Sequence, residues 1–381
     1  MRIANVIEES RIGGPQIRNL KIAEVLKGKI DITLVFPEKN SKDLKKRCNL
    51  TGVKYLSLSL TTINRSLIGI LLYVILFPFE VIILAWVLRK YNFDLVHVSG
   101  GSWQCKGIFA AKLARINVVW ELNDTYTPKI VRNIFLLISR LADGFIFASE
   151  STKKYYKRFI PIKKKNFVIQ SPVDINFYKP SLNYRNDRFL DKAIKKKKII
   201  IGTVANVSPI KDLRLFVNVA NKLSIYSNKI VFIVIGEIYS SQKKYFDNLI
   251  YTIKSLVIKN FFFLNARRDI RSLLKTMDIY VCTSKKESSP LSVWEAMSME
   301  KAIVSTDVGD VKRFVKNNVN GLIVEAGNIN KLAKSIKKLI ERPKLRKKFG
   351  KKSRQIAKNK LNIKICAKLY SVAYRALAKS Y

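Results

Sequence analysis

Short apolar runs alternate with longer amphipathic runs along most of this chain, and that alternation limits the fold more than any other feature. The apolar runs of the first half cover residues 3–7, 32–36, 95–98, 118–122, 144–148 and 167–169. A basic, irregular stretch at 178–198 interrupts the pattern, which resumes at 199–204, 230–235, 261–264, 279–282, 302–305 and 321–324. Strands that alternate with helices form parallel, doubly wound sheets. The sequence therefore predicts an α/β protein with two Rossmann-like domains, for which 381 residues suffice.

Two glutamates lie eight positions apart around a predicted helix start in the second half. Glu287 precedes Ser289 and Pro290, which favour the N-cap and the first helical position, and Glu295 follows inside the helix. Open amides and a positive dipole end make such a helix start a site for phosphate or diphosphate. Glu295 can accept hydrogen bonds from a diol such as a ribose, and Glu287 can reach a second hydroxylated group. The competing interpretation is a pair of surface glutamates that happen to flank a helix.

The segment after this helix extends the pattern. A short apolar strand at 301–306 leads into Asp307-Val-Gly-Asp310, and an amphipathic piece ends at Asn320-Gly-Leu-Ile-Val324. In this order the residues resemble the retaining glycosyltransferases of family 4, whose second half carries a Glu, seven residues, Glu signature. The resemblance implies the GT-B fold, in which two Rossmann-like domains face each other across a cleft. It places an acceptor-side domain at 1–180 and a nucleotide-sugar domain at 181–362, with a last helix within 363–381 packing back on the first domain.

The same resemblance assigns roles to residues of the second domain. Glu295 would hold the ribose of a nucleotide-sugar donor, linked to UDP or GDP, and Glu287 would contact the donor sugar as the catalytic residue. Lys211 and the amides of Leu291 and Ser292 would hold the diphosphate. No DxD-like pair stands near these residues, and neither a metal ion nor another cofactor is expected.

Four further positions match the family less closely. Asn206 occupies the place of an arginine that contacts the diphosphate, and Gly14, after Gly13, lies in the loop that borders the donor phosphates. Asn123 stands where the family often has a histidine near the transferred sugar, and it would orient a sugar hydroxyl. His97 ends a predicted strand and faces the cleft in this topology. It is a candidate base near neutral pH, although a structural hydrogen-bonding role competes with that interpretation.

The chain departs from the family pattern at several places that leave the two glutamates and Lys211 intact. The departures are Ser288, Glu300, Ala302, Asp310 and Arg313. An active enzyme is therefore expected. The alternatives are a catalytically degenerate homologue and, on charge alone, a basic nucleic-acid-binding protein.

The formal charge of +45, from 72 Lys and Arg against 27 Asp and Glu, indicates an anionic partner surface. Nucleic acid and anionic lipid are the two candidates. The lysine runs lack interleaved aromatic residues, and no nucleic-acid-binding motif occurs, so no specific nucleic acid is expected. Four widely spaced cysteines form no CxxC pair and are interpreted as reduced thiols of a cytoplasmic protein.

An apolar stretch at 67–88 is long enough to cross a bilayer, but Pro78 and Glu80 lie in its middle, and Arg65, Arg89 and Lys90 flank it. We expect one or two helices lying in the membrane interface, with the basic residues meeting anionic head groups. A buried helix covering the sheet is the alternative. The acceptor is then expected to be a lipid-linked saccharide or a growing surface glycan, at the inner face of the cell membrane.

Overall fold

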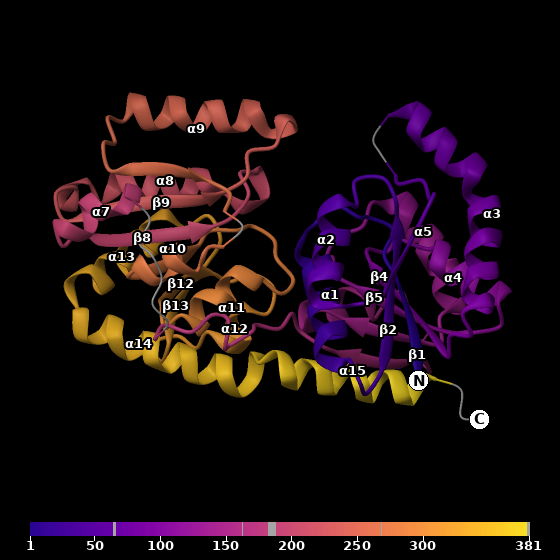
Figure 1. Ribbon diagram of the computed structural model, residues 1–381. Coiled ribbons are helices and arrows are strands. Elements are labelled where there is room, and N and C mark those ends of the chain that lie inside the picture. Colours follow the sequence, from indigo (N-terminus) through magenta and orange to yellow (C-terminus); the bar gives the residue numbers. More distant parts are fainter. Residues whose placement is uncertain (64–65, 162, 182–187, 268, 379–381) are drawn as a thin grey trace. The chain divides into compact units, whose positions relative to one another are not determined.

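A computed structural model describes residues 1–63, 66–161, 163–181, 188–267 and 269–378 (Figure 1). The chain divides into two compact units. Unit 1 comprises residues 1–172 and 363–381, and unit 2 comprises residues 173–362. The expected boundary after residue 180 is eight residues too late, because Val173 and Tyr178 are buried in a core cluster of unit 2.

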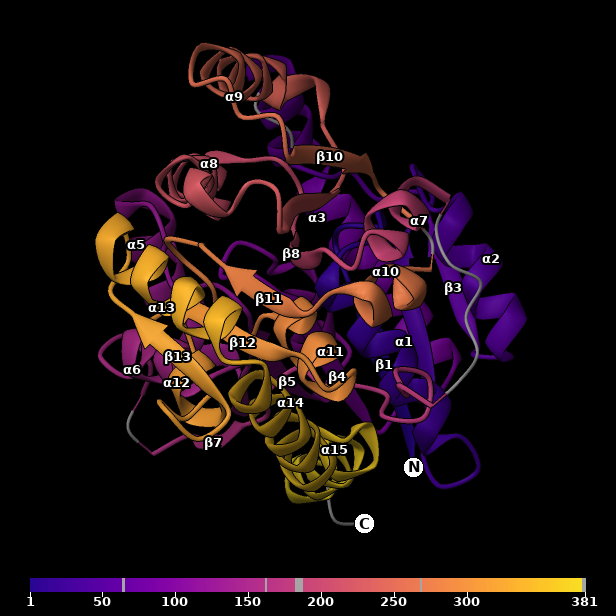
Figure 2. The ribbon, with the colours of Figure 1, turned by 90° about the vertical axis from the view of Figure 1, so that its left-hand side faces the viewer.

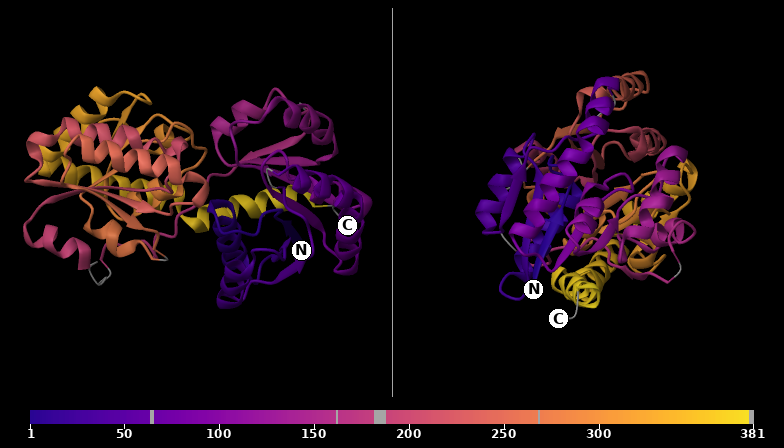
Figure 3. Two further views of the ribbon diagram at one scale, coloured as in Figure 1. Left: turned by 90° about the horizontal axis from the view of Figure 1, so that it is seen from above. Right: turned by 90° about the vertical axis from the view of Figure 1, so that its right-hand side faces the viewer.

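Unit 1 is built on a seven-stranded sheet with the order β3-β2-β1-β4-β5-β6-β7, and every neighbouring pair is parallel. Its strands are β1 (Arg2–Val6), β2 (Asp31–Pro37), β3 (Tyr55–Leu58), β4 (Leu95–Gly100), β5 (Asn117–Leu122), β6 (Gly144–Phe147) and β7 (Lys165–Val168). The first and the last described residues of the chain both belong to this unit (Figure 3).

Helices cover both faces of this sheet. They are α1 (Gly14–Leu26), α2 (Lys42–Thr51), α3 (Leu67–Lys90), α4 (Lys106–Leu113), α5 (Lys129–Ile138), α6 (Glu150–Tyr156) and α15 (Ile363–Leu377). Side chains of α1, α2 and α15 share one buried cluster with the sheet. Side chains of α3, α4, α5 and α6 share the cluster on the other face. The last helix thus packs within unit 1, where α15 lies against α1, and residues 379–381 lie outside the described part.

Unit 2 contains a six-stranded parallel sheet with the order β10-β9-β8-β11-β12-β13. Its strands are β8 (Ile199–Val204), β9 (Ile230–Gly236), β10 (Phe261–Asn265), β11 (Ile279–Cys282), β12 (Ala302–Thr306) and β13 (Gly321–Val324), and Figure 2 shows several of them fanning out in sheet order. Its helices are α7 (Arg188–Lys195), α8 (Leu213–Lys222), α9 (Lys243–Ser255), α10 (Arg271–Thr276), α11 (Leu291–Ser298), α12 (Val311–Phe314), α13 (Ile329–Glu341) and α14 (Pro343–Ile356).

The two sheets confirm the predicted fold class. The strands are nearly continuous apolar runs because helices bury both faces of each sheet. In such open sheets ligands bind beyond the carboxyl ends of the strands. The loops after β1 and β5 in unit 1, and after β8 and β11 in unit 2, are therefore the places to look for a site.

The apolar stretch at 67–88 forms one helix, α3, which is long and apolar enough to cross a membrane, with a mean hydropathy of 2.7. Its second half packs on the sheet through Val81, Leu84 and Leu88. Most of its first half is exposed, including Leu67 at 85% and Ile68 at 73%. The buried-helix alternative therefore describes the second half of α3, and membrane contact of the exposed part stays a prediction. The flanking Arg65 lies outside the described residues.

Candidate active site

The loop between β11 and α11 carries the first of the predicted site residues. β11 ends at Cys282, and α11 begins at Leu291 with Pro290 as its N-cap. The prediction that Ser289 caps this helix is therefore wrong by one residue. The hydroxyl of Ser289 instead accepts a hydrogen bond from Nε1 of Trp294 at 3.1 Å, because a buried indole N–H needs a partner.

Lys211 and Glu287 form the central contact of this site. Lys211 ends the short turn Pro209–Lys211 after β8, and its Nζ lies 2.5 Å from Oε1 of Glu287. The hydroxyl of Ser284 donates a second hydrogen bond to the same oxygen at 2.8 Å. β8 and β11 are neighbours in the sheet, so their carboxyl ends bring together two residues 76 positions apart. The structure thus joins the residue predicted for the diphosphate to the residue predicted for the sugar.

The backbone of this loop rests on Gly309. Gly309 has a φ of +52°, and a Cβ there would lie only 2.3 Å from the carbonyl oxygen of Ser288. The amide of Asp310 donates to that same carbonyl oxygen at 3.0 Å. Only glycine combines this backbone conformation with so close an approach, so the position of Glu287 depends on a glycine 22 residues further along.

Glu295 lies more than one turn inside α11 and is half-buried. The hydroxyl of Tyr178 forms a hydrogen bond with its carboxylate, and burial, followed by this carboxylate, raises the pKa of Tyr178. The backbone of Tyr178 is fixed because its carbonyl oxygen accepts from Ser298 Oγ at 2.7 Å and from Arg354 Nη1 at 3.0 Å. No local motif marks Tyr178, since it belongs to the irregular stretch before the second sheet.

Three other predicted donor residues lie on these same loops. Leu291 and Ser292 are the first residues of α11, where an α-helix leaves its amides without intrahelical acceptors. Asn206 is exposed after β8; its Nδ2 donates to the hydroxyl of Tyr239 at 3.2 Å, and its Oδ1 accepts from the amide of Glu237 at 3.3 Å. The Asn206 amide is therefore held by the segment that follows β9.

The loop after β1 in unit 1 leads into Gly14, the first residue of α1. The side-chain amide of Gln16 forms hydrogen bonds with the backbone at two points of this loop. Its Oε1 accepts from the amide of Gly13 at 3.1 Å, and its Nε2 donates to the carbonyl oxygen of Glu9 at 2.7 Å. Gly14 thus begins α1 at the carboxyl edge of the first sheet.

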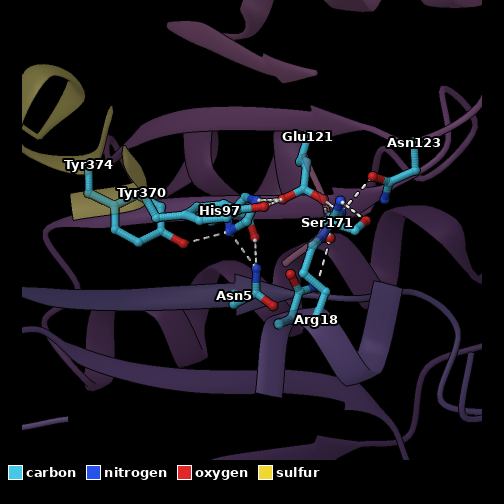
Figure 4. A network of polar contacts seen from close by, with 10 residues as sticks. Asn5, Arg18, His97, Glu121, Asn123, Ser171, Tyr370 and Tyr374 are labelled. Atoms are coloured by element: carbon cyan, nitrogen blue, oxygen red, sulfur yellow. Dashed lines mark hydrogen bonds and ion pairs between the residues drawn. The ribbon is translucent and has the colours of Figure 1, made fainter. Parts of the chain in front are cut away.

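His97 lies in a buried polar network of unit 1 (Figure 4). Its Nδ1 is 2.7 Å from Nδ2 of Asn5 and 2.9 Å from the hydroxyl of Tyr374, and its Nε2 is 3.1 Å from Oε2 of Glu121. Because the Asn5 amide donates to Nδ1, the ring proton sits on Nε2. Burial, and then the charge of Arg18, lowers the pKa of His97 to about 3. The expectation that His97 faces a ligand is corrected: its ring is neutral and enclosed.

The same network reaches Asn123 at the end of β5 (Figure 4). Arg18 pairs with the fully buried Glu121, which also accepts from the hydroxyl of Tyr370 at 2.6 Å. Nη2 of Arg18 donates to Oδ1 of Asn123 at 2.6 Å. Oδ1 is thereby occupied, and Nδ2 of Asn123 is left as a donor without a hydrogen-bond partner in the described part of the chain.

Metal-ligating side chains are scattered. Across the ranges that the structure describes, no three His, Cys, Asp or Glu side chains come together in a group that could hold a metal ion. Lys211 and Glu287 are among the charged groups that meet at the strand ends of unit 2.

Comparison with known families gives two matches that together span most of the chain. Residues 12–177 match "Glycosyltransferase Family 4", and residues 185–356 match "Glycosyl transferases group 1". Each match falls largely within one of the two units.

Two of the curated relatives with stated activities match this chain over more than half of its length. The chain is 28% identical over 291 residues to the N,N'-diacetylbacillosaminyl-diphospho-undecaprenol alpha-1,3-N-acetylgalactosaminyltransferase of Campylobacter jejuni, covering 72% of this chain and 75% of that protein. It is 25% identical over 261 residues to the UDP-Gal:alpha-D-GlcNAc-diphosphoundecaprenol alpha-1,3-galactosyltransferase of Escherichia coli, covering 64% of this chain and 65% of that protein.

Solved structures share the fold. The Anabaena HepE protein in complex with UDP is 19% identical with a TM-score of 0.84, covering 99% of this chain and all of that one. A glycosyltransferase from Rickettsia africae is 18% identical with a TM-score of 0.83, covering all of this chain and 99% of that one.

Proposed function

Because the chain belongs to the family 4, group 1 glycosyltransferases, we propose that it moves a sugar from a nucleotide-sugar to a lipid-linked saccharide with retention of the anomeric configuration. The observation that carries this proposal is the contact between Lys211 and Glu287. A cation and a carboxylate this close are suited to the two sides of the bond that breaks, where negative charge grows on the diphosphate and positive charge on the sugar.

Each donor contact has a place in this arrangement. Lys211 and the first amides of α11 would neutralise the departing diphosphate, without the need for a metal ion. Glu295 would accept hydrogen bonds from the ribose hydroxyls, with its carboxylate oriented by Tyr178. Glu287 would hold the sugar and support positive charge at its reacting carbon.

The proposed reaction forms one bond and breaks one. The acceptor hydroxyl oxygen bonds to the anomeric carbon on the face from which the diphosphate leaves, and the hydroxyl proton passes to the departing diphosphate oxygen. An α-linked donor then gives an α-linked product. The names of both curated relatives, which specify alpha-1,3 transfer, support this stereochemistry.

The relatives also narrow the substrates. Both names include an undecaprenol-linked diphosphosaccharide acceptor, and one of them specifies UDP-Gal as the donor. We therefore propose a UDP-sugar over a GDP-sugar, and an undecaprenyl-diphosphate-linked saccharide as the acceptor. Such a product would serve the synthesis of a surface polysaccharide or lipopolysaccharide.

Two measurements test this function. Thermal unfolding with a panel of UDP- and GDP-sugars should show stabilisation by the true donor, because a ligand that binds only the folded state raises its stability. NMR of the product made from an α-linked donor should then show an α linkage. A β product, or no transfer to any undecaprenyl-diphosphate saccharide, would overturn the proposal.

Membrane attachment of this enzyme would rest on α3, lying along the inner face of the membrane rather than crossing it. Two buried residues of α3, Glu80 and Tyr73, tie the helix to the rest of unit 1. Glu80 pairs with Lys106 and accepts from the amide of Thr61 at 2.6 Å, and the hydroxyl of Tyr73 donates to Glu8 at 2.9 Å. A spanning helix would pull these pairs apart and leave Lys106 buried without its counter-charge, which costs several kcal/mol. Peripheral attachment keeps them intact.

A further inference from the structure

Helix α5 presents an apolar stripe to the outside of unit 1. Ile130, Ile134 and Leu137 follow one another at helical spacing and are 75%, 51% and 68% exposed. The opposite face of the helix, with Phe135 and Ile138, is buried in the core. A helix that is apolar on both faces normally has a second apolar neighbour, and α5 lacks one among the described residues of its own unit on the exposed side.

The apolar stripe of α5 lies on a helix that covers the same face of the first sheet as α3. Both helices contribute to the buried cluster on the same face of the first sheet (Figure 1). In a parallel α/β unit each helix runs back along its strand, so both α3 and α5 begin at the carboxyl edge of the sheet. Asn123 and Gly14 lie at that same edge. The exposed first half of α3 and the first stripe residue of α5, Ile130, therefore lie toward the side of the sheet where ligands bind.

The charges around the stripe decide what can cover it. Lys129, Arg132 and Arg140 lie on or next to α5, and the sequence has no acidic residue between Asp124 and Asp143. A second copy of a chain with a net charge of +45 would bring like charges together across such a face. An anionic bilayer would meet the basic residues with head groups and the apolar stripe with acyl chains.

We propose that α5 is a second membrane-contacting element, whose stripe enters the boundary between the head groups and acyl chains of an anionic bilayer beside α3. This inference rests on the proposed membrane-bound function. Membrane contact through both α3 and α5 fixes the orientation of unit 1 on the bilayer. With α3 alone, unit 1 could still rotate about the axis of that helix. The saccharide of a lipid-linked acceptor, at head-group level, then meets the carboxyl edge of the first sheet.

Contact with lipid is tested directly by placing a fluorophore on the stripe. Ile134→Cys in the full chain is labelled with an environment-sensitive dye and mixed with phosphatidylglycerol-containing vesicles that carry a quencher in their acyl chains. The matched control is Ile225→Cys, an exposed apolar position of unit 2. Quenching at position 134 but not at position 225 is expected. Vesicle binding without quenching at position 134 would overturn the proposal, as would shielding of the dye by self-association in the absence of lipid.

The consequence for activity is tested with the triple variant Ile130→Ser, Ile134→Ser, Leu137→Ser. Its transfer rate to an acceptor in anionic vesicles should fall roughly tenfold, while its rate on the same acceptor in detergent micelles stays at the wild-type value. Equal rates in vesicles would refute the orienting role. If the wild-type chain transfers no sugar in micelles, the proposed reaction fails, and the quenching result still stands on its own.

Discussion

The Lys211–Glu287 contact predicts opposite effects of two substitutions on nucleotide binding. The Lys211 ammonium is held by the Glu287 carboxylate at 2.5 Å. A diphosphate that needs Lys211 must compete with that carboxylate. Lys211→Ala should therefore weaken UDP binding, whereas Glu287→Gln should leave it unchanged or strengthen it, even though Glu287→Gln removes the residue expected to support the sugar during transfer.

The size of these effects follows from exposure. A charge-assisted hydrogen bond contributes about 1.5 to 3 kcal/mol. The Lys211 and Glu287 side chains are 28% and 16% exposed, and solvent screening lowers this range to roughly 1 to 2 kcal/mol, or about 5- to 30-fold in affinity. Lys211→Ala should lose about this much for UDP and little for uridine. Glu287→Gln should gain at most a similar factor, while its catalytic rate falls by roughly a hundredfold or more.

Calorimetry with UDP on the two single variants and the double variant measures the coupling free energy between Lys211 and Glu287 in UDP binding. If the residues compete, Glu287→Gln has no effect once Lys211 is absent. Lys285→Gln is the matched control for charge, because Lys285 lies on the same loop, is 59% exposed and pairs with Asp212 at 3.7 Å. Weaker UDP binding in Glu287→Gln, equal to that of Lys211→Ala, would refute the competition. A wild-type transfer rate in Glu287→Gln would remove the residue from the reaction.

Three other predictions follow from the described contacts. His97 is the one histidine of the sequence, so its NMR signals are unambiguous; with a pKa of about 3 they should not titrate between pH 5 and 8, and titration near 6.5 would contradict the buried network. Because the unfolded chain takes up this proton near pH 6.5 and the folded chain does not, the contribution of His97 to stability falls as the pH drops below 6.5, which denaturant titration across pH can measure. Glu295→Ala should weaken uridine and UDP binding about tenfold in calorimetry, and Tyr178→Phe only a few-fold, since it removes one neutral donor to that carboxylate; equal losses would mean that Tyr178 contacts the nucleotide itself. Serine at exposed apolar positions of α3 should move the protein from the membrane to the soluble fraction with its fold intact, as judged by circular dichroism; unfolding would show that this face belongs to the core. The positions are Leu71, Val74, Leu76 and Phe79.

The sequence predicted strands well where both faces of the sheet are covered. Apolar runs such as 199–204 and 279–282 coincide with β8 and β11, because burial on both faces leaves no polar positions. β3 was missed. It is a four-residue edge strand with every side chain half-buried, so its sequence carries neither a continuous apolar run nor a clear alternation.

The sequence allowed prediction of those site residues that belong to a local sequence motif. The helix-start pattern marked Glu287, and the family resemblance marked Lys211. Their contact follows from the order of the strands. Tyr178 and Arg18 were missed because each acts through a partner more than a hundred positions away, Glu295 and Asn123 respectively. Glu300, where the family pattern has glycine, adopts a φ of +59°, so the local geometry that favours glycine persists without it.

The apolar stretch of α3 shows why composition alone could not choose between membrane and core. Glu80 looked like an interruption of a membrane-spanning segment. In the structure it is 4% exposed and pairs with Lys106, whose partners also include the Thr61 carbonyl oxygen at 2.7 Å. The Glu80 carboxylate points inward and pairs with the first residue of α4. The outer face of α3 therefore remains apolar. A single acidic residue in an apolar helix can thus anchor the helix to its own domain while the opposite face stays apolar and exposed.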